Sequence, residues 1–115
     1  MEKRLLDAYF AGLIDGEGCV DVYNYKQGTL KRPVVKVDMT CEITVRRLHD
    51  YFGGYCSIKK TRAGTKPQWR WEVTFQNAVR VCKQLAPYLV TKAEGAKRVM
   101  QYKPARPRGR PRKTA

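Results

Sequence analysis

Hydrophobic and polar positions follow two different periods in the first part of the chain. Apolar and small residues recur every three or four positions between residues 3 and 15, which predicts a helix. Gly16 and Gly18 are expected to end it. Residues 19–25 are rich in β-branched and aromatic side chains, and residues 33–40 alternate apolar with polar side chains, so both segments are predicted strands. Because the connection between them is short, they are expected to form an antiparallel hairpin.

A second helix and a second hairpin are predicted from residue 45 onward. Val45, Leu48 and Phe52 have helical spacing, and two glycines follow them as a helix stop. Residues 55–61 and 68–75 are the next predicted strands. In the last of these strands, tryptophan, valine and phenylalanine occupy one face and polar residues the other.

Two helices are predicted to follow the last strand. Asn77 is the expected N-cap of the first. Thr91 and Glu94 have the spacing of a capping box, which predicts a final helix that reaches about Tyr102. The core stripe expected for the first of these helices is Ala78, Val81, Cys82 and Leu85. The complete order predicts an α+β fold with four antiparallel strands and helices on one face of the sheet.

The charge of the chain indicates which class of partner it binds. Among 115 residues, 24 are Lys or Arg and 10 are Asp or Glu, which gives a net charge of +14. Six of the positive charges lie between Lys103 and Lys113, a stretch without acids or large apolar residues. We therefore predict a folded domain at residues 1–102 and a disordered basic tail at residues 103–115. Both parts are basic and favour a polyanion.

Nucleic acid is favoured over an anionic membrane as this partner. Trp69 and Trp71 lie in a predicted strand, whereas a membrane-surface helix would carry them on its apolar face. No apolar run approaches the roughly 18 residues that would span a bilayer. The N-terminal residues do not resemble a signal peptide, so we expect a protein that is not secreted.

Metal-binding spacings are absent from the cysteine pattern. The four cysteines are far apart in sequence, and His49 is the single histidine. We interpret the cysteines as reduced, small buried hydrophobic residues and His49 as a residue on a helix surface. A catalytic Cys–His pair is the alternative. Under either interpretation we expect no small-molecule cofactor.

The most informative motif runs from Phe10 to Gly18 and reads FAGLIDGEG. Ala8, Gly12 and Gly16 are four residues apart, so they lie along one side of the first helix, where small side chains allow a second helix to approach closely. A glycine inside a helix costs about 1 kcal/mol relative to alanine, so Gly12 favours such an approach over an ordinary core helix. This stretch resembles the signature of the LAGLIDADG homing endonucleases.

The resemblance extends over residues 5–102. It implies the family's α-β-β-α-β-β-α fold with a saddle-shaped sheet. Phe52–Tyr55 resembles the family's glycine turn before the third strand, and Leu85–Lys92 resembles the segment that carries a basic residue into the active site. Family members with one motif are homodimers. The resemblance therefore implies a homodimer here, and its expected interface is Ala8, Gly12, Leu13 and Gly16.

The chemistry implied by the resemblance is Mg²⁺-dependent hydrolysis of phosphodiester bonds in a specific double-stranded DNA sequence. Glu17 and the backbone of Gly16 would hold the metal ion, and Lys92 would assist catalysis. Asp15 is expected to make structural hydrogen bonds instead. Such proteins belong to introns or other mobile elements, so we expect a bacterial, phage or organelle gene product in the cytoplasm or nucleoid.

Strand alternation predicts which side chains of the open sheet face read DNA. Counted outward from Glu17, the expected readers are Asp21, Tyr23, Tyr25, Arg32, Lys36, Asp38, Tyr55, Ser57, Lys59, Gln68 and Arg70. The tail adds a stretch from Arg106 to Lys113 that resembles an AT-hook, in which Arg108, Gly109 and Arg110 would enter an A·T-rich minor groove. A non-specific basic arm is the alternative for the tail.

One departure from the family pattern keeps two other functions open. Some members carry an amide after the second strand, but the corresponding stretch here is Met39–Glu42, without Asn or Gln. Thr40 or Glu42 could replace it, or cleavage is weakened. A DNA-binding regulator that does not cleave is one alternative, and an RNA-binding maturase is the other.

Overall fold

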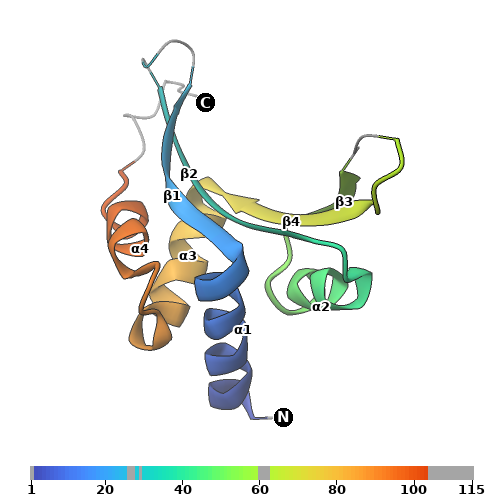
Figure 1. Cartoon of the computed structure of the whole chain (residues 1–115). Helices are drawn as coiled ribbons and strands as arrows, with labels where there is room; N and C mark the ends of the chain where they lie inside the picture. The colour runs from blue at the N-terminus through green and yellow to red at the C-terminus, as the bar shows by residue number, and fades with distance from the viewer. Residues whose placement is uncertain (1, 26–27, 29, 60–62, 104–115) are drawn as a thin grey trace, which may run out of the picture.

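The computed structural model describes residues 2–25, 28, 30–59 and 63–103. Its elements follow the predicted α+β order (Figure 1). They are α1 (Lys3–Glu17), β1 (Gly18–Tyr25), β2 (Leu30–Met39), α2 (Glu42–Phe52), β3 (Tyr55–Lys59), β4 (Gln68–Thr74), α3 (Phe75–Leu85), the 3₁₀ turn η1 (Ala86–Tyr88) and α4 (Ala93–Met100).

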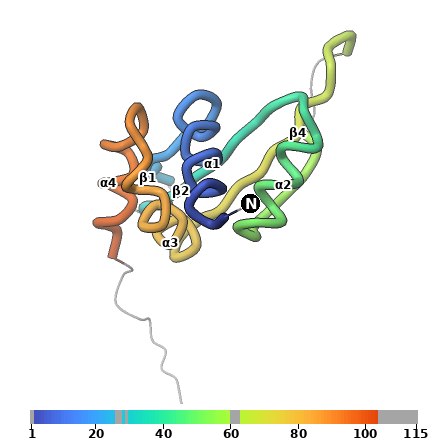
Figure 2. The backbone as a smooth tube through the Cα atoms, turned by 90° about the horizontal axis from the view of Figure 1, so that it is seen from below, coloured from blue at the N-terminus to red at the C-terminus, as the bar shows by residue number. Residues whose placement is uncertain are grey.

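The four strands form one antiparallel sheet in the order β1-β2-β4-β3. The helices α1, α2 and α3 lie against one face of this sheet, while α4 flanks β1 (Figure 1). Helix α1 stands upright beneath the sheet, with its C-terminal end at the sheet and its N-terminus pointing away. Seen from below, α1 runs between α2 on one side and α3 and α4 on the other (Figure 2).

The core fills the space between the sheet and these helices. Trp71 is fully buried in β4, and its indole N–H donates a hydrogen bond to the carbonyl oxygen of Gly53 at 2.8 Å. Val37 lies opposite Trp71 in the strand register, and the predicted stripe of α3 is buried as expected. Burial raises the pKa of the Cys82 thiol in that stripe to about 12.

Helix α1 is longer than predicted because only its second expected stop ends it. Gly16 lies inside the helix, and Glu17 is its last residue rather than the first one beyond it. Gly18 is the C-cap in an extended conformation. A Cβ atom there would lie 2.9 Å from the carbonyl oxygen of Ile14 and 3.0 Å from that of Lys36, so close backbone packing requires glycine.

The starts of α3 and α4 also differ from the predictions. Phe75 is not part of a strand: it is the first residue of α3 and has a φ of 52°, so Asn77 lies inside the helix and does not cap it. Thr91 does not form a capping box, because Lys92 is the N-cap of α4 and makes no side-chain cap bond. At the start of α4 a tertiary contact replaces local capping, because the backbone N–H of Lys92 donates a hydrogen bond to Asp15 of α1.

Smaller corrections concern strand ends and cysteines. Strand β2 begins at Leu30, earlier than predicted, and the predicted end of the third strand at residues 60 and 61 lies outside the described residues. All four cysteines are free, but Cys19 and Cys41 are exposed and only Cys82 is buried, so the expectation of four buried cysteines is wrong. His49 lies exposed on α2 as expected. None of the described helices is both long and apolar enough to cross a membrane.

Candidate active site and nucleic-acid interface

Glu17 lies at the end of α1, where this helix meets the sheet (Figure 1). Its side chain is exposed, and within the described ranges it has no ion-pair partner. The last carbonyl groups of a helix lack partners inside the helix, and they form the negative end of its dipole. A carboxylate beside free carbonyl oxygens is a suitable environment for a hard cation.

Asp15 connects this helix end to the segment before α4. Its Oδ2 accepts a hydrogen bond from the backbone N–H of Val90 at 2.8 Å, and its Oδ1 accepts one from that of Lys92 at 2.9 Å. These are the structural hydrogen bonds that the sequence led us to expect of Asp15. They fix the backbone of Lys92 next to the last turn of α1. Asp15, which accepts both bonds, lies two residues before Glu17 in the chain. The catalytic role of Lys92 stays a prediction.

The metal-binding capacity of a single chain is small. Among the described residues there is no group of three or more His, Cys, Asp or Glu side chains that could hold a metal ion. Glu17 and neighbouring carbonyl oxygens fit Mg²⁺, which accepts one or two carboxylates and completes its shell with water and phosphate oxygens. One copy of this end of α1 therefore offers a cation a single carboxylate and backbone carbonyl oxygens, and no further acidic side chain joins them among the described residues.

The side of α1 that faces away from the core is apolar and open. Leu5 and Tyr9 are 53% and 50% exposed, although both are large hydrophobic residues. Ala8, Gly12 and Gly16 are exposed on the same side, and Leu13 is half-buried. A Cβ atom at either glycine would meet nothing within 4 Å outside the adjacent part of its own helix, so packing among the described residues does not require glycine there. A cavity of about 400 Å³ adjoins this side, lined by Leu6, Tyr9, Phe10, Arg47, Asp50 and Tyr51.

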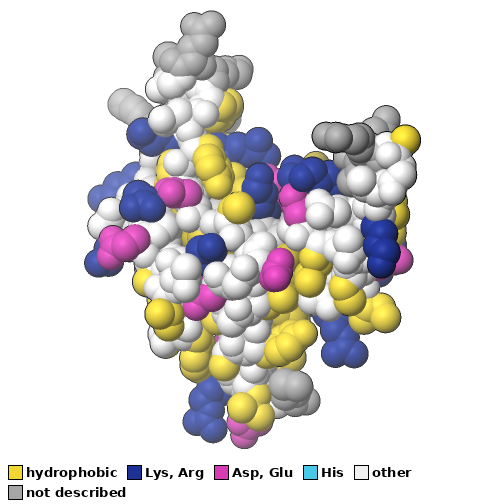
Figure 3. Space-filling view, in the orientation of Figure 1, with side chains coloured by type: hydrophobic (Ala, Val, Ile, Leu, Met, Phe, Trp, Pro, Cys, Tyr) yellow, Lys and Arg dark blue, Asp and Glu magenta, His cyan; other side chains and the backbone are white. Residues whose placement is uncertain are grey.

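The open face of the sheet carries every strand residue predicted to read DNA. The register aligns Tyr23 with Arg32, Asp38 with Arg70, and Arg70 with Ser57, and alternation then places the whole set on the face opposite the helices. Lysine and arginine side chains gather there between the two raised ends of the sheet, with acidic side chains among them (Figure 3).

Arg70 and Arg32 on the open face form ion pairs with acidic side chains. Asp38 Oδ1 accepts from Nε of Arg70 at 2.7 Å, and Asp38 Oδ2 accepts from Nη2 of the same guanidinium at 2.9 Å and from Nζ of Lys59 at 3.3 Å. The hydrogen bonds from Arg70, followed by those from Lys59, outweigh burial and lower the pKa of the Asp38 carboxyl. Arg32 makes a single 3.3 Å contact with Glu72.

Asp21 forms a similar pair with α4. Its carboxylate accepts two hydrogen bonds from Arg98, at 2.8 and 3.0 Å, and these lower the pKa of Asp21. Sequence reasoning did not include Glu72 or Arg98 in the site. Glu72 could have been found, because it alternates with Arg70 on the same strand face, whereas Arg98 is 77 residues from its partner and carries no local signal.

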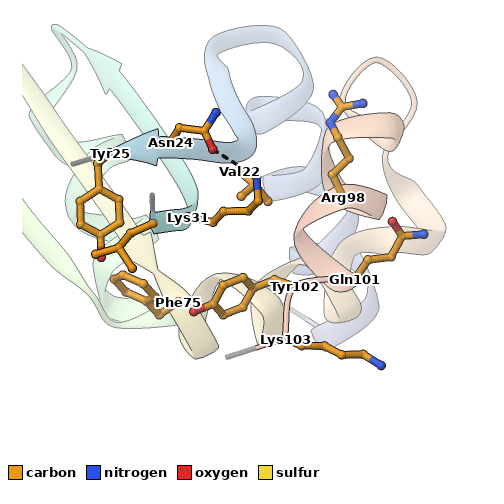
Figure 4. Close-up of a pocket in the computed structure, with 10 residues that line it drawn as sticks. Val22, Asn24, Tyr25, Lys31, Phe75, Arg98, Gln101, Tyr102 and Lys103 are labelled. Carbon is orange, nitrogen blue, oxygen red and sulfur yellow. Dashed lines mark hydrogen bonds between the residues drawn. The ribbon is translucent and has the colours of Figure 1, made fainter. Parts of the chain in front are cut away.

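Three other predicted readers lie in different surroundings. The ammonium of Lys36 lies 5.8 Å above the ring of Tyr23, an arrangement that keeps both side chains on the open face. Tyr25, at the end of β1, lines a cavity of about 680 Å³ that opens between the β1–β2 hairpin and the C-terminal end of α4 (Figure 4). The AT-hook-like residues Arg108, Gly109 and Arg110 lie outside the described residues.

No known family model matches this sequence, and no curated protein sequence matches it. Solved structures of homing endonucleases do match its fold. I-CvuI, crystallised on the I-CreI target with Mg²⁺ and uncleaved DNA, is 23% identical over 85% of this chain and 65% of its own, with a TM-score of 0.67. I-TnaI is 17% identical over 83% of this chain and 69% of its own, with a TM-score of 0.63.

A third structure, the LAGLIDADG meganuclease I-AabMI bound to uncleaved DNA, is 18% identical over 79% of this chain, with a TM-score of 0.59. The present chain spans 33% of I-AabMI and less than two thirds of I-CvuI. It has the fold of the LAGLIDADG homing endonucleases, which confirms the expected fold.

Proposed function

We propose that this protein is a sequence-specific endonuclease that cleaves double-stranded DNA as a homodimer with Mg²⁺. The observation that carries the proposal is the position of Glu17 on this fold. An exposed carboxylate ends the helix that carries the LAGLIDADG-like motif, at the point where that helix meets the sheet, and the open face of the same sheet is rich in lysine and arginine (Figures 1 and 3). Several proteins of the same fold are homing endonucleases in complex with DNA.

The dimer is part of the proposal because one chain offers only half of a cleavage centre. Packing among the described residues does not require the glycines of α1, whereas a second α1 helix against them would explain both glycines and the exposed Leu5 and Tyr9. In that arrangement two copies of Glu17 lie near the twofold axis. A cation between them would offset the repulsion between the carboxylates.

Each of these residues has a separate role in the proposed hydrolysis of the phosphodiester bond. Glu17 and the carbonyl of Gly16 would hold the cation, and Asp15 keeps the segment with Lys92 against this helix end. Lys92 then places a positive charge near the phosphate, where negative charge develops in the transition state. Bound Mg²⁺ supplies Lewis-acid stabilisation of that charge and a more acidic bound water.

Glu17→Gln tests the chemistry. Wild-type protein with Mg²⁺ should cut DNA from its own genome at a discrete site, which mapping of double-strand breaks detects. The variant should lose cleavage by at least about 100-fold, because it removes a charged ligand, and it should still bind the site. Glu2→Gln, at the other end of the same helix, is the matched control and should cut normally. Equal cleavage by wild type and Glu17→Gln would contradict the assignment.

A non-cleaving DNA-binding regulator is the second candidate. Glu42 is one of the two residues that could replace the missing amide. Its Oε2 forms an ion pair with Nε of Arg46 at 2.7 Å. That leaves Thr40 as the remaining candidate for this role. Sequence-specific binding without any cleavage by wild-type protein would favour the regulator.

A further inference from the structure

Among the described residues, the ion pair between Asp38 and Arg70 has shorter contacts than the other ion pairs between sheet strands, Lys59–Asp38 and Arg32–Glu72. Asp38 lies in β2 directly opposite Arg70 in β4. The two side chains share two hydrogen bonds, at 2.7 and 2.9 Å, and they are 21% and 30% exposed. Arg32, by contrast, is 46% exposed and touches its carboxylate partner once, at 3.3 Å.

The geometry of the pair determines which donors of Arg70 stay available. A guanidinium has five N–H donors, and Asp38 uses Nε–H and one N–H of Nη2, which lie along the side of the group. The two donors of Nη1 and the second donor of Nη2 have no acceptor among the described residues. Nη1 and Nη2 lie at the end of the guanidinium. The two N–H groups there that point away from the side chain, one on Nη1 and one on Nη2, form its end-on fork, and this fork is unpaired.

Asp38 itself has little capacity left to read a base. Its Oδ1 accepts from Arg70, and its Oδ2 accepts from both Arg70 and Lys59. A cytosine amino group would therefore compete with two cations for the same carboxylate. The three charges sum to +1, which suits a groove between phosphates.

We propose that Asp38 is a positioning residue that holds Arg70 so that its end-on fork reads the O6 and N7 atoms of one guanine in the major groove. This inference rests on the proposed function, because it requires DNA on the open sheet face. Guanine is the base that offers two acceptors to such a fork, whereas adenine pairs its N7 with a donor. Fixing the arginine before binding lowers the conformational entropy that binding would otherwise cost.

The test measures base preference rather than affinity alone. Wild-type protein and variants are bound to a library of duplexes with randomised sequence, and the bound fraction is sequenced. Wild type should require guanine at one position in each half-site. Arg70→Lys should reduce that preference roughly 5- to 100-fold while the other positions stay unchanged.

Asp38→Ala should give two opposite effects. The guanine preference at that position should fall at least about fivefold, because the fork is no longer held. Binding to unrelated duplexes should become stronger, since a negative charge leaves the DNA-facing surface. Asp38→Asn keeps one acceptor and the shape, so it should give an intermediate preference. Glu72→Gln removes the same charge from the same face and should strengthen binding without changing that position.

A chemical probe checks the contact itself. Replacing the selected guanine by 7-deazaguanine removes N7, so wild type should lose affinity and Asp38→Ala should lose much less. Wild-type binding with a base profile that Asp38→Ala leaves unchanged would overturn this inference and leave the proposed function intact. If wild-type protein bound no duplex at all, both would be overturned.

Discussion

At the residue scale, a buried carboxylate connects three helices through hydrogen bonds. Asp7 is 4% exposed, and its Oδ1 accepts hydrogen bonds from the hydroxyl of Tyr51 at 2.7 Å and the amide of Gln84 at 2.8 Å. Lys3 adds an ion pair at 3.0 Å. Burial alone would raise the pKa of Asp7, but the hydrogen bonds from Gln84, Tyr51 and Lys3 outweigh it, and the pKa lies below the ordinary value. One side chain thus connects α1, α2 and α3.

Asp7→Asn should lower the free energy of unfolding by about 1–3 kcal/mol at neutral pH, because it leaves buried donors without a charged acceptor. The folded-state pKa is depressed, so this stabilisation is present above the unfolded pKa of about 3.9 and is lost as pH falls through the folded pKa. Urea unfolding at neutral pH and at successively lower pH measures the difference between wild type and variant, which should shrink in acid.

The matched control is Lys3→Ala, which removes the exposed partner of the same carboxylate. Its side chain is 71% exposed, so the change in stability should be much smaller than that of Asp7→Asn. A difference between wild type and Asp7→Asn that stays constant down to the most acid pH would show that the charge of Asp7 contributes nothing.

At the element scale, helix α1 has two faces with different tasks. Phe10, Ala11 and Ile14 are buried beneath the sheet. The opposite face exposes Leu5, Tyr9 and the glycines, although nothing in the chain prevents side chains at the glycine positions. Folding of the protomer explains the first face, and close contact with a second copy is the proposed explanation of the second.

Gly12→Leu separates these tasks because its two expected effects have opposite signs. Leucine forms helix better than glycine by up to about 1 kcal/mol, so the protomer should unfold no more easily than wild type. The dimer should dissociate with a Kd at least about tenfold higher, since close helix contact is lost. Sedimentation equilibrium and thermal unfolding measure the two effects.

Lys83→Leu is the control for this experiment, because it places leucine on an exposed position of a different helix, α3. It should leave the association state unchanged. If Gly12→Leu sediments like wild type and cleaves equally well, the proposed interface is wrong.

At the scale of the whole molecule, charge is divided between the fold and the C-terminal tail. Residues 103–115 carry six of the positive charges, so their deletion changes the net charge from +14 to +8. If most of these charges meet phosphates, the slope of log affinity against log salt should decrease by several units, at about 0.9 per contact. Titration of full-length and truncated protein at several salt concentrations measures this slope.

The same titration distinguishes an AT-hook from a non-specific arm. With a minor-groove hook at Arg108–Arg110, truncation should weaken binding more on sites with A·T-rich flanks than on sites with G·C-rich flanks. The folded domain should keep its unfolding temperature, because the tail contains nothing to bury. Equal losses on both flanks would leave only a basic arm, and an unchanged salt slope would exclude phosphate contacts by the tail.

The amino-acid sequence by itself determined the features that depend on local periodicity. Alternation of apolar and polar residues specified the four strands and which of their faces is open, because a strand's period of two leaves no other choice once Trp71 and Val73 lie inside. Helical spacing specified the core stripe of α3 and the exposed small residues of α1. The motif at Phe10–Gly18 indicated the fold from sequence alone.

Tertiary structure decided whatever depends on partners distant in the chain. Asp7 could have been placed on the buried face from its spacing to Phe10 and Ile14, but its acceptor role needs Gln84, which is 77 residues away. The start of α4 was predicted from a local capping box, yet the N–H of Lys92 bonds to Asp15 of α1. Capping and ion pairing between segments far apart in sequence depend on three-dimensional proximity, which the pattern along a chain does not contain.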